Sequence, residues 1–261
     1  MKIHRIYAIV LKLLFTFRHN VNRLVDVFYW PALDLLLWGV TGIYIQKLSP
    51  DAGKITAMFI SGIVLWILIW RGQHEITLGV LDDLWDKNMI NVFGSPLLLE
   101  EWLVAFIITG IIKAVISFTF AVLIALLLYG INLLQYGVYL LLLAMILIIN
   151  GWWVGFLVSG LIIRFGTRIE TLAWSFLSLF MPFSAIYYPL AILPGWAQAV
   201  ARFVPASYVF ESGRELLFGR PFPWNYFYMG MGINLVFFVL SYLFLRSSFR
   251  SALDRGMAKI Y

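Results

Sequence analysis

The sequence predicts an all-α protein that crosses a membrane several times. Of its 261 residues, 62% are hydrophobic and only 12% are charged, which is about half the charged share of an ordinary soluble domain. The apolar residues form continuous runs and do not alternate with polar ones as the strands of a membrane β-barrel do. This composition excludes a soluble, a nucleic-acid-binding and a disordered protein.

Residues 1–25 are predicted to form an amphipathic helix that lies in the membrane interface. Apolar residues recur at every third or fourth position from Ile3 to Leu24. Arg5, Lys12 and Arg23 lie largely outside that apolar stripe, where cations can meet anionic lipid headgroups. The alternative is an ordinary basic flank ahead of the first span.

Six segments are apolar enough to serve as spanning helices, each of which needs about 20 residues. The break between the third and the fourth falls at Gly130 and Asn132, inside a long apolar run. We expect spans near residues 27–46, 55–79, 102–129, 133–163, 171–188 and 226–245. The whole chain then forms one transmembrane domain, residues 1–261.

The positions of Lys and Arg predict the orientation. With an even number of spans, most of the 19 basic residues fall on the side that holds both termini. Basic residues accumulate on the cytoplasmic side of membrane proteins. We therefore expect both termini in the cytoplasm of a bacterial or archaeal cell, with the chain in the plasma (inner) membrane.

Two connections are long enough to hold structure of their own. The cytoplasmic one, after the second span, is acidic, and we expect a short helix near residues 82–93. The outer one, residues 189–220, contains Pro194, Trp196 and Pro205, followed by Glu211 and Arg214 at helical spacing. Because polar backbone at membrane depth must be buried in protein, short re-entrant helices are expected there.

The sequence offers few motifs for catalysis. It has no cysteine and only three scattered histidines, and it contains no phosphate-binding loop of the GxxxxGK[ST] type. Asp82, Asp83 and Asp86 form a DDxxD motif, which could hold Mg²⁺ against a diphosphate. A prenyltransferase-like membrane enzyme is therefore one alternative, but a second acidic cluster is lacking. A solvated or partner-facing acidic turn is the preferred interpretation.

The acidic turn and the outer connection together resemble the permeases of ABC-2 type transporters. The similar stretches are Asn91-Val92-Phe93-Gly94-Ser95-Pro96-Leu97, Tyr188-Pro189, Leu193-Pro194-Gly195-Trp196 and Arg214-Glu215-Leu216-Leu217-Phe218-Gly219. The resemblance implies a homodimeric transport subunit that is not itself an enzyme and binds no cofactor, since ATP and Mg²⁺ belong to a separate ABC ATPase subunit. The cargo would be a lipid-linked glycan, a lipid or an amphipathic small molecule, moved outward between the two halves.

Several residues are candidates for these roles. The expected contact with the ATPase consists of Asp82, Asp83, Trp85, Asp86, Met89 and Phe93. Candidates for the translocation path are Trp152, Trp174, Phe180, Phe183, Tyr187 and Tyr188, although lipid packing also explains such aromatic residues.

Charged residues inside the predicted spans are functional candidates by default. Asp34, expected near the cytoplasmic interface, and Lys113, expected near mid-depth, form a pair in one hypothesis. The alternative is that Lys113 extends toward the interface and Asp34 sits in headgroup water. For Arg71, His74 and Glu75 we expect a salt-bridged helix surface, with a substrate-contacting vestibule as the alternative.

Overall fold

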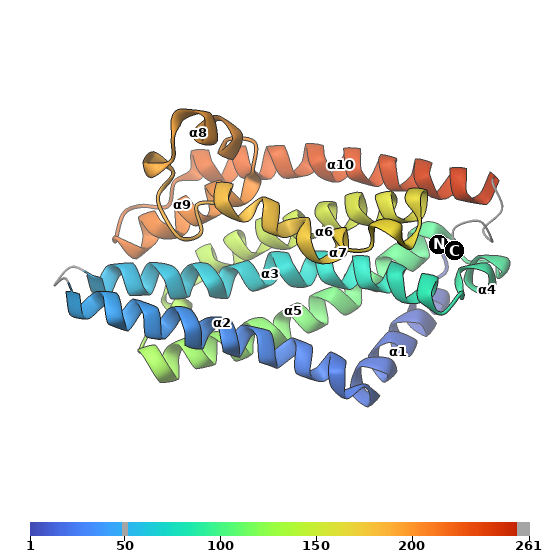
Figure 1. Cartoon of the computed structure of the whole chain (residues 1–261), viewed down its shortest axis with the longest axis horizontal. Helices are drawn as coiled ribbons and strands as arrows, with labels where there is room; N and C mark the ends of the chain where they lie inside the picture. Colours follow the sequence, from blue (N-terminus) through green and yellow to red (C-terminus); the bar gives the residue numbers. More distant parts are fainter. Residues whose placement is uncertain (49–51, 255–261) are drawn as a thin grey trace.

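The computed structural model describes residues 1–48 and 52–254, and all regular elements within them are helical. Five helices are long and apolar enough to cross a membrane, which confirms a multi-pass helical protein. They are α2 (Val21–Leu48), α3 (Ala52–Trp85), α5 (Leu99–Tyr129), α6 (Val138–Phe165) and α10 (Trp224–Asp254). All five run roughly along the long axis of the molecule (Figure 1).

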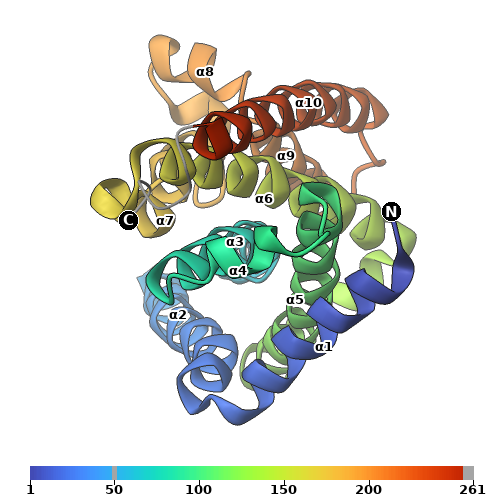
Figure 2. The ribbon, with the colours of Figure 1, turned by 90° about the vertical axis from the view of Figure 1, so that its right-hand side faces the viewer.

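Helix α3 lies at the centre of this bundle. It contacts α2 and α5 on one side and α6 on the other, and α6 in turn packs against α10 (Figure 2). The contact between α3 and α6 is close because both helices carry glycine there. A Cβ atom added to Gly151 would lie 2.5 Å from the carbonyl oxygen of Ile69 and 2.9 Å from Cα of Gly72.

The expectation of a regular spanning helix at residues 171–188 is corrected by the structure. The chain forms α7 (Leu172–Ser175) and the 3-10 turns η3 (Leu177–Leu179) and η4 (Met181–Phe183). Pro182 cannot donate a backbone hydrogen bond, which disfavours a continuous α-helix. The segment still follows the bundle, from the end where α6 stops toward the end that carries α8 (Figure 1).

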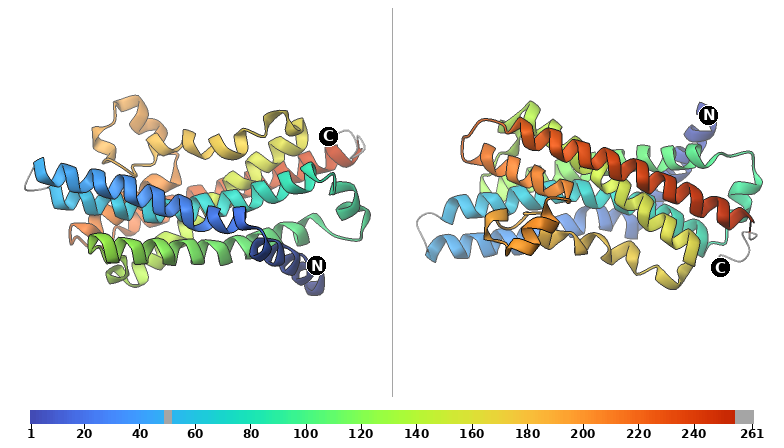
Figure 3. Two further views of the ribbon diagram at one scale, coloured as in Figure 1. Left: turned by 60° about the horizontal axis from the view of Figure 1, so that its bottom comes forward. Right: turned by 90° about the horizontal axis from the view of Figure 1, so that it is seen from above.

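Helix α1 (Ile3–His19) leaves the start of α2 at an angle (Figure 3, left). Its apolar side contacts α5, where Ile6 and Val10 are buried against Ala105. The expected bounds of 1–25 are too long, because a new helix begins at Val21.

Short helices occupy the two ends of the bundle. Helix α3 continues through Trp85, so the expected short helix at 82–93 is reduced to α4 (Met89–Gly94). At the opposite end, η5 (Leu190–Ile192), α8 (Gly195–Ala201) and α9 (Pro205–Leu217) form the outer connection (Figure 3, right). The predicted break is present too: Gly130, at φ +66°, ends α5. The turn η1 (Leu133–Tyr136) follows it, and α6 therefore starts at Val138 and not at 133.

Candidate functional site

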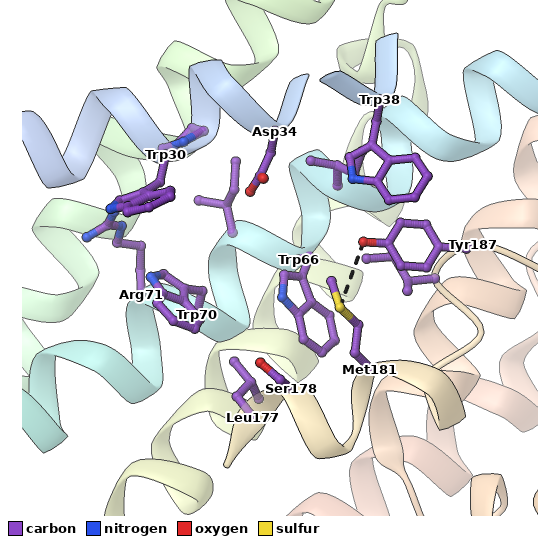
Figure 4. Close-up of a pocket in the computed structure, with 14 residues that line it drawn as sticks. Trp30, Asp34, Trp38, Trp66, Trp70, Arg71, Leu177, Ser178, Met181 and Tyr187 are labelled. Carbon is purple, nitrogen blue, oxygen red and sulfur yellow. Dashed lines mark hydrogen bonds between the residues drawn. The ribbon is translucent and has the colours of Figure 1, made fainter. Parts of the chain in front are cut away.

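A groove lined by tryptophan opens between α2, α3 and the irregular segment after α7 (Figure 4). Its empty volume is about 810 Å³, part of which is open to the outside. We call it the tryptophan groove, and its lining consists of Trp30, Pro31, Asp34, Trp38, Ile63, Trp66, Ile67, Trp70, Arg71, Leu177, Ser178, Met181, Ile186 and Tyr187.

Helical spacing brings these aromatic rings together. Trp30, Asp34 and Trp38 are four residues apart on α2, and Trp66 and Trp70 are four apart on α3, so each set shares one face of its helix. The irregular segment closes the third side. There the ring of Tyr187 stacks on Trp38 with 4.6 Å between ring centroids.

Asp34 supplies the unpartnered charge of the groove. It lies halfway along the 28-residue α2, not near its end as expected, and its side chain is exposed. Its carboxylate points into the groove and has no ion pair or hydrogen bond with any described residue (Figure 4). A carboxylate halfway along an apolar helix is costly to place against hydrocarbon. The groove is therefore suited to water or to a polar group of a ligand.

Two ion pairs lie beside the groove, one buried and one with a partly exposed carboxylate, that of Asp26. The guanidinium of Arg71 donates to the carboxylate of Asp26 at 2.5 Å and to the Asp26 backbone carbonyl at 2.6 Å. The ammonium of Lys113 contacts the two carboxylate oxygens of Glu75 at 2.6 and 2.8 Å. Within this chain, the predicted pair of Asp34 and Lys113 is therefore wrong.

The expectation of a salt-bridged surface on α3 is also wrong. Arg71, His74 and Glu75 are all buried, and the partners of Arg71 and Glu75 come from α2 and α5. The ring of His74 stacks on Trp70 and lies 3.6 Å from the Asp26 carboxylate. These residues hold α2, α3 and α5 together, because each buried charge needs its opposite nearby.

The expected docking residues divide into buried and exposed ones. Met89 is buried, and Phe93 packs edge-on against Trp102 and Phe249. Trp85 and Asp86 are exposed, although the indole of Trp85 also donates to Glu170 at 2.9 Å. Five of the residues exposed at this end are here called the docking surface: Trp85, Asp86, Lys87, Ile90 and Asn91.

Two carboxylates of the DDxxD motif are already engaged in structural contacts. Asp82 pairs with Arg23 at 2.5 Å. Asp83 is buried and accepts hydrogen bonds from Trp102 and Asn88, each at 3.1 Å. In residues 1–48 and 52–254 no three His, Asp or Glu side chains are grouped so that they could hold a metal ion.

Of the six aromatic residues predicted to line a path, only Tyr187 lies in the groove. Phe180 packs against Trp153, and Phe183 against Trp196. Trp174 contacts His74 edge-on, Tyr188 donates to the carbonyl of Pro182, and the indole N–H of Trp152 is buried without a partner. Sequence reasoning missed Trp30, Trp38, Trp66 and Trp70, although their spacing of four or eight residues was a usable signal.

Arg214 joins the outer connection to the irregular segment that precedes it. This buried guanidinium pairs with Glu211 at 2.7 Å and donates to the carbonyl of Ala185 at 2.7 Å. Glu211 also accepts from the backbone N–H of Leu190 at 2.7 Å. Pro194 and Pro205 begin α8 and α9, while Trp196 is largely exposed. Glu211 and Arg214 therefore hold the segment after the groove in place.

Known proteins give no family assignment for this chain. No protein-family model matches the sequence, and no curated protein matches it significantly. The residues of the tryptophan groove and of the docking surface therefore carry the functional interpretation.

Proposed function

We propose that this chain is the membrane subunit of an ATP-driven exporter of the ABC-2 type, working as a homodimer with a separate ATPase subunit. The observation that carries the proposal is the carboxylate of Asp34 in the tryptophan groove. An unpaired charge on an exposed face halfway along α2 calls for a polar path along that face. The cargo is a lipid-linked glycan, a lipid or an amphipathic small molecule.

The proposed topology has six passages, with the irregular segment between α6 and α8 as the fifth. In support, the start of α1 and the end of α10 lie at the same end of the bundle (Figure 1), as an even number of passages requires. We place that end in the cytoplasm of a bacterium or archaeon, since most basic residues of the chain fall there.

The energy for transport enters at the docking surface. Helix α3 carries Trp85 of this surface and also Trp66 and Trp70 of the groove. The distance along the helix from Trp85 to Trp70 is about 22 Å at 1.5 Å per residue. A rigid helix of this length transmits a push at its cytoplasmic end into the wall of the groove.

The prenyltransferase alternative gains no support from the site. Its metal-binding role requires Asp82 and Asp83 to face a diphosphate. Asp82 instead pairs with Arg23, and Asp83 is buried against Trp102. Both contacts join helices of the bundle, and no observation in the described residues favours the enzyme.

The docking part of the proposal is tested with an exposed apolar residue of α4. Ile90 is 48% exposed, so Ile90→Asp leaves the core intact and places a charge on the docking surface. An ABC ATPase subunit is sought in the neighbouring reading frames and co-expressed with the chain, and we expect this variant to lose co-purification with it, together with any stimulation of ATP hydrolysis. Phe203→Asp is the matched control, because Phe203 is 69% exposed at the opposite end. Equal association of all three proteins with the ATPase would count against docking at α4.

The polar path is tested by thiol labelling, which is simple because the chain contains no cysteine. We expect Asp34→Cys in native membranes to react with a water-soluble, membrane-impermeant maleimide. Val115→Cys is the control, since Val115 is 56% exposed near the middle of α5 on an apolar surface. If the two variants react equally slowly, the groove is not open to water and the transport path lies elsewhere.

A further inference from the structure

The charge balance of the tryptophan groove indicates what it binds. Asp34 has no partner among the described residues, whereas the only basic residue in the lining, Arg71, is neutralised by Asp26 at 2.5 Å. The groove thus presents one net negative charge. Since an unpaired carboxylate among apolar side chains is costly, a bound cation stabilises it.

The walls of the groove favour an organic cation over a metal ion. A hard metal ion needs about six oxygen ligands, and the groove offers one carboxylate beside four indole rings. Indole faces attract cations, and aromatic cages of this kind bind quaternary ammonium groups. Trp38 and Tyr187, whose stacked rings have 4.6 Å between centroids, both border the groove that holds Asp34.

The lining of the groove is of the kind that small-molecule sites have. It consists mostly of apolar and aromatic side chains with few polar groups, Asp34 among them. We propose that the tryptophan groove binds lipophilic organic cations, with Asp34 as counter-ion and the indole rings around the charge. This proposal rests on the transport function above and narrows its cargo to the amphipathic small molecules.

The experiment compares two ions of the same shape and opposite charge. Radiolabelled tetraphenylphosphonium is bound at equilibrium to the full chain purified in a non-ionic detergent, and radiolabelled tetraphenylborate is measured in a separate, parallel sample because the two ions pair with each other when mixed. We expect saturable binding of the cation and none of the anion. Absence of saturable cation binding, or equal saturable binding of the anion, overturns the proposal, as does a stable dimer in which a second copy covers the groove and excludes the cation.

Variants assign the binding to Asp34. Asp34→Asn keeps the size of the side chain and removes its charge, and we expect it to weaken cation binding about tenfold, corresponding to about 1.4 kcal/mol. Asp34→Glu retains the charge and should bind nearly as the wild type does. Asp254→Asn is the control for net charge, because Asp254 is exposed at the end of α10. Unchanged binding by Asp34→Asn overturns the proposal.

The outcome is separable from the fate of the transport proposal. Cation binding needs no ATPase. If the chain binds the cation through Asp34 but recruits no ATPase, the proposed cation site is supported and the exporter proposal is contradicted. Conversely, if an ATPase associates through Ile90 while Asp34→Asn has no effect on cation binding, that result contradicts only the proposal that the cargo is cationic.

Discussion

At the scale of single residues, the pair of Glu75 and Lys113 is the most consequential contact outside the groove. Both residues are buried, and the ammonium lies 2.6 and 2.8 Å from the two carboxylate oxygens. Each side chain is long and charged, and the pair joins α3 to α5. Replacing one residue of the pair is therefore expected to lower the stability of the protein more than replacing both.

Lys113→Met alone is expected to destabilise the protein by about 3–5 kcal/mol, because Glu75 is then a buried charge without a partner. Adding Glu75→Gln to Lys113→Met should recover most of that loss. The measurement is thermal unfolding of the purified chain in detergent for the two single variants and the double variant. Additive losses in the double variant would show that the two side chains contribute independently.

The same pair shows where reasoning from sequence stops at this scale. A lysine in an apolar run, such as Lys113, indicates that an acidic partner lies nearby, but the sequence offers both Glu75 and Asp34 as partners. Only the packing of α3 against α5 selects Glu75. In the same way, the spacing of Trp30, Asp34 and Trp38 predicts a shared face but not what that face meets.

At the scale of helices, the approach of α3 and α6 depends on glycine. Gly151→Ala would place a methyl group 2.5 Å from the carbonyl oxygen of Ile69, and overpacking of this kind costs about 1–3 kcal/mol. We expect a lower midpoint of thermal unfolding for this variant.

The matched control is Gly232→Ala on α10. A Cβ atom at Gly232 meets nothing within 4 Å, and alanine favours a helix over glycine by about 1 kcal/mol. This variant should therefore be as stable as the wild type or slightly more so. If the two alanine variants unfold at the same temperature, the close contact of α3 and α6 does not limit stability.

Helices and their ends differ in how well the sequence predicts them. The five long helices follow from continuous apolar runs, and Gly130 marks the turn after α5 because it adopts φ +66°. The segment at 171–188 is also predominantly apolar but carries Pro182 and Ala185, the latter at φ +62°. Apolar composition predicts burial or membrane contact there, whereas the local backbone decides whether the helix stays regular.

At the scale of the whole molecule, the two proposed functions fall at different positions along one axis. The docking surface lies at the end that carries α4, and the outer helices α8 and α9 lie at the other end (Figure 1). The groove is lined by residues near the middle of α3, from Ile63 to Arg71. Motion from one end can reach the groove through α3, which borders both. The proposed exporter needs this chain to have one fixed orientation in its membrane.

That orientation leads to a prediction for intact cells, again using the absence of native cysteine. Ile192→Cys, at a position that is 72% exposed next to α8, should react with an impermeant maleimide added outside the cells. Ile90→Cys, at a position that is 48% exposed on α4, should react only after the membrane is permeabilised. The expected difference follows from the basic residues at the α4 end, which favour the cytoplasm. The reverse labelling pattern would place the docking surface outside the cell. No ATP-hydrolysing subunit could act on it there, so this result would contradict the exporter proposal.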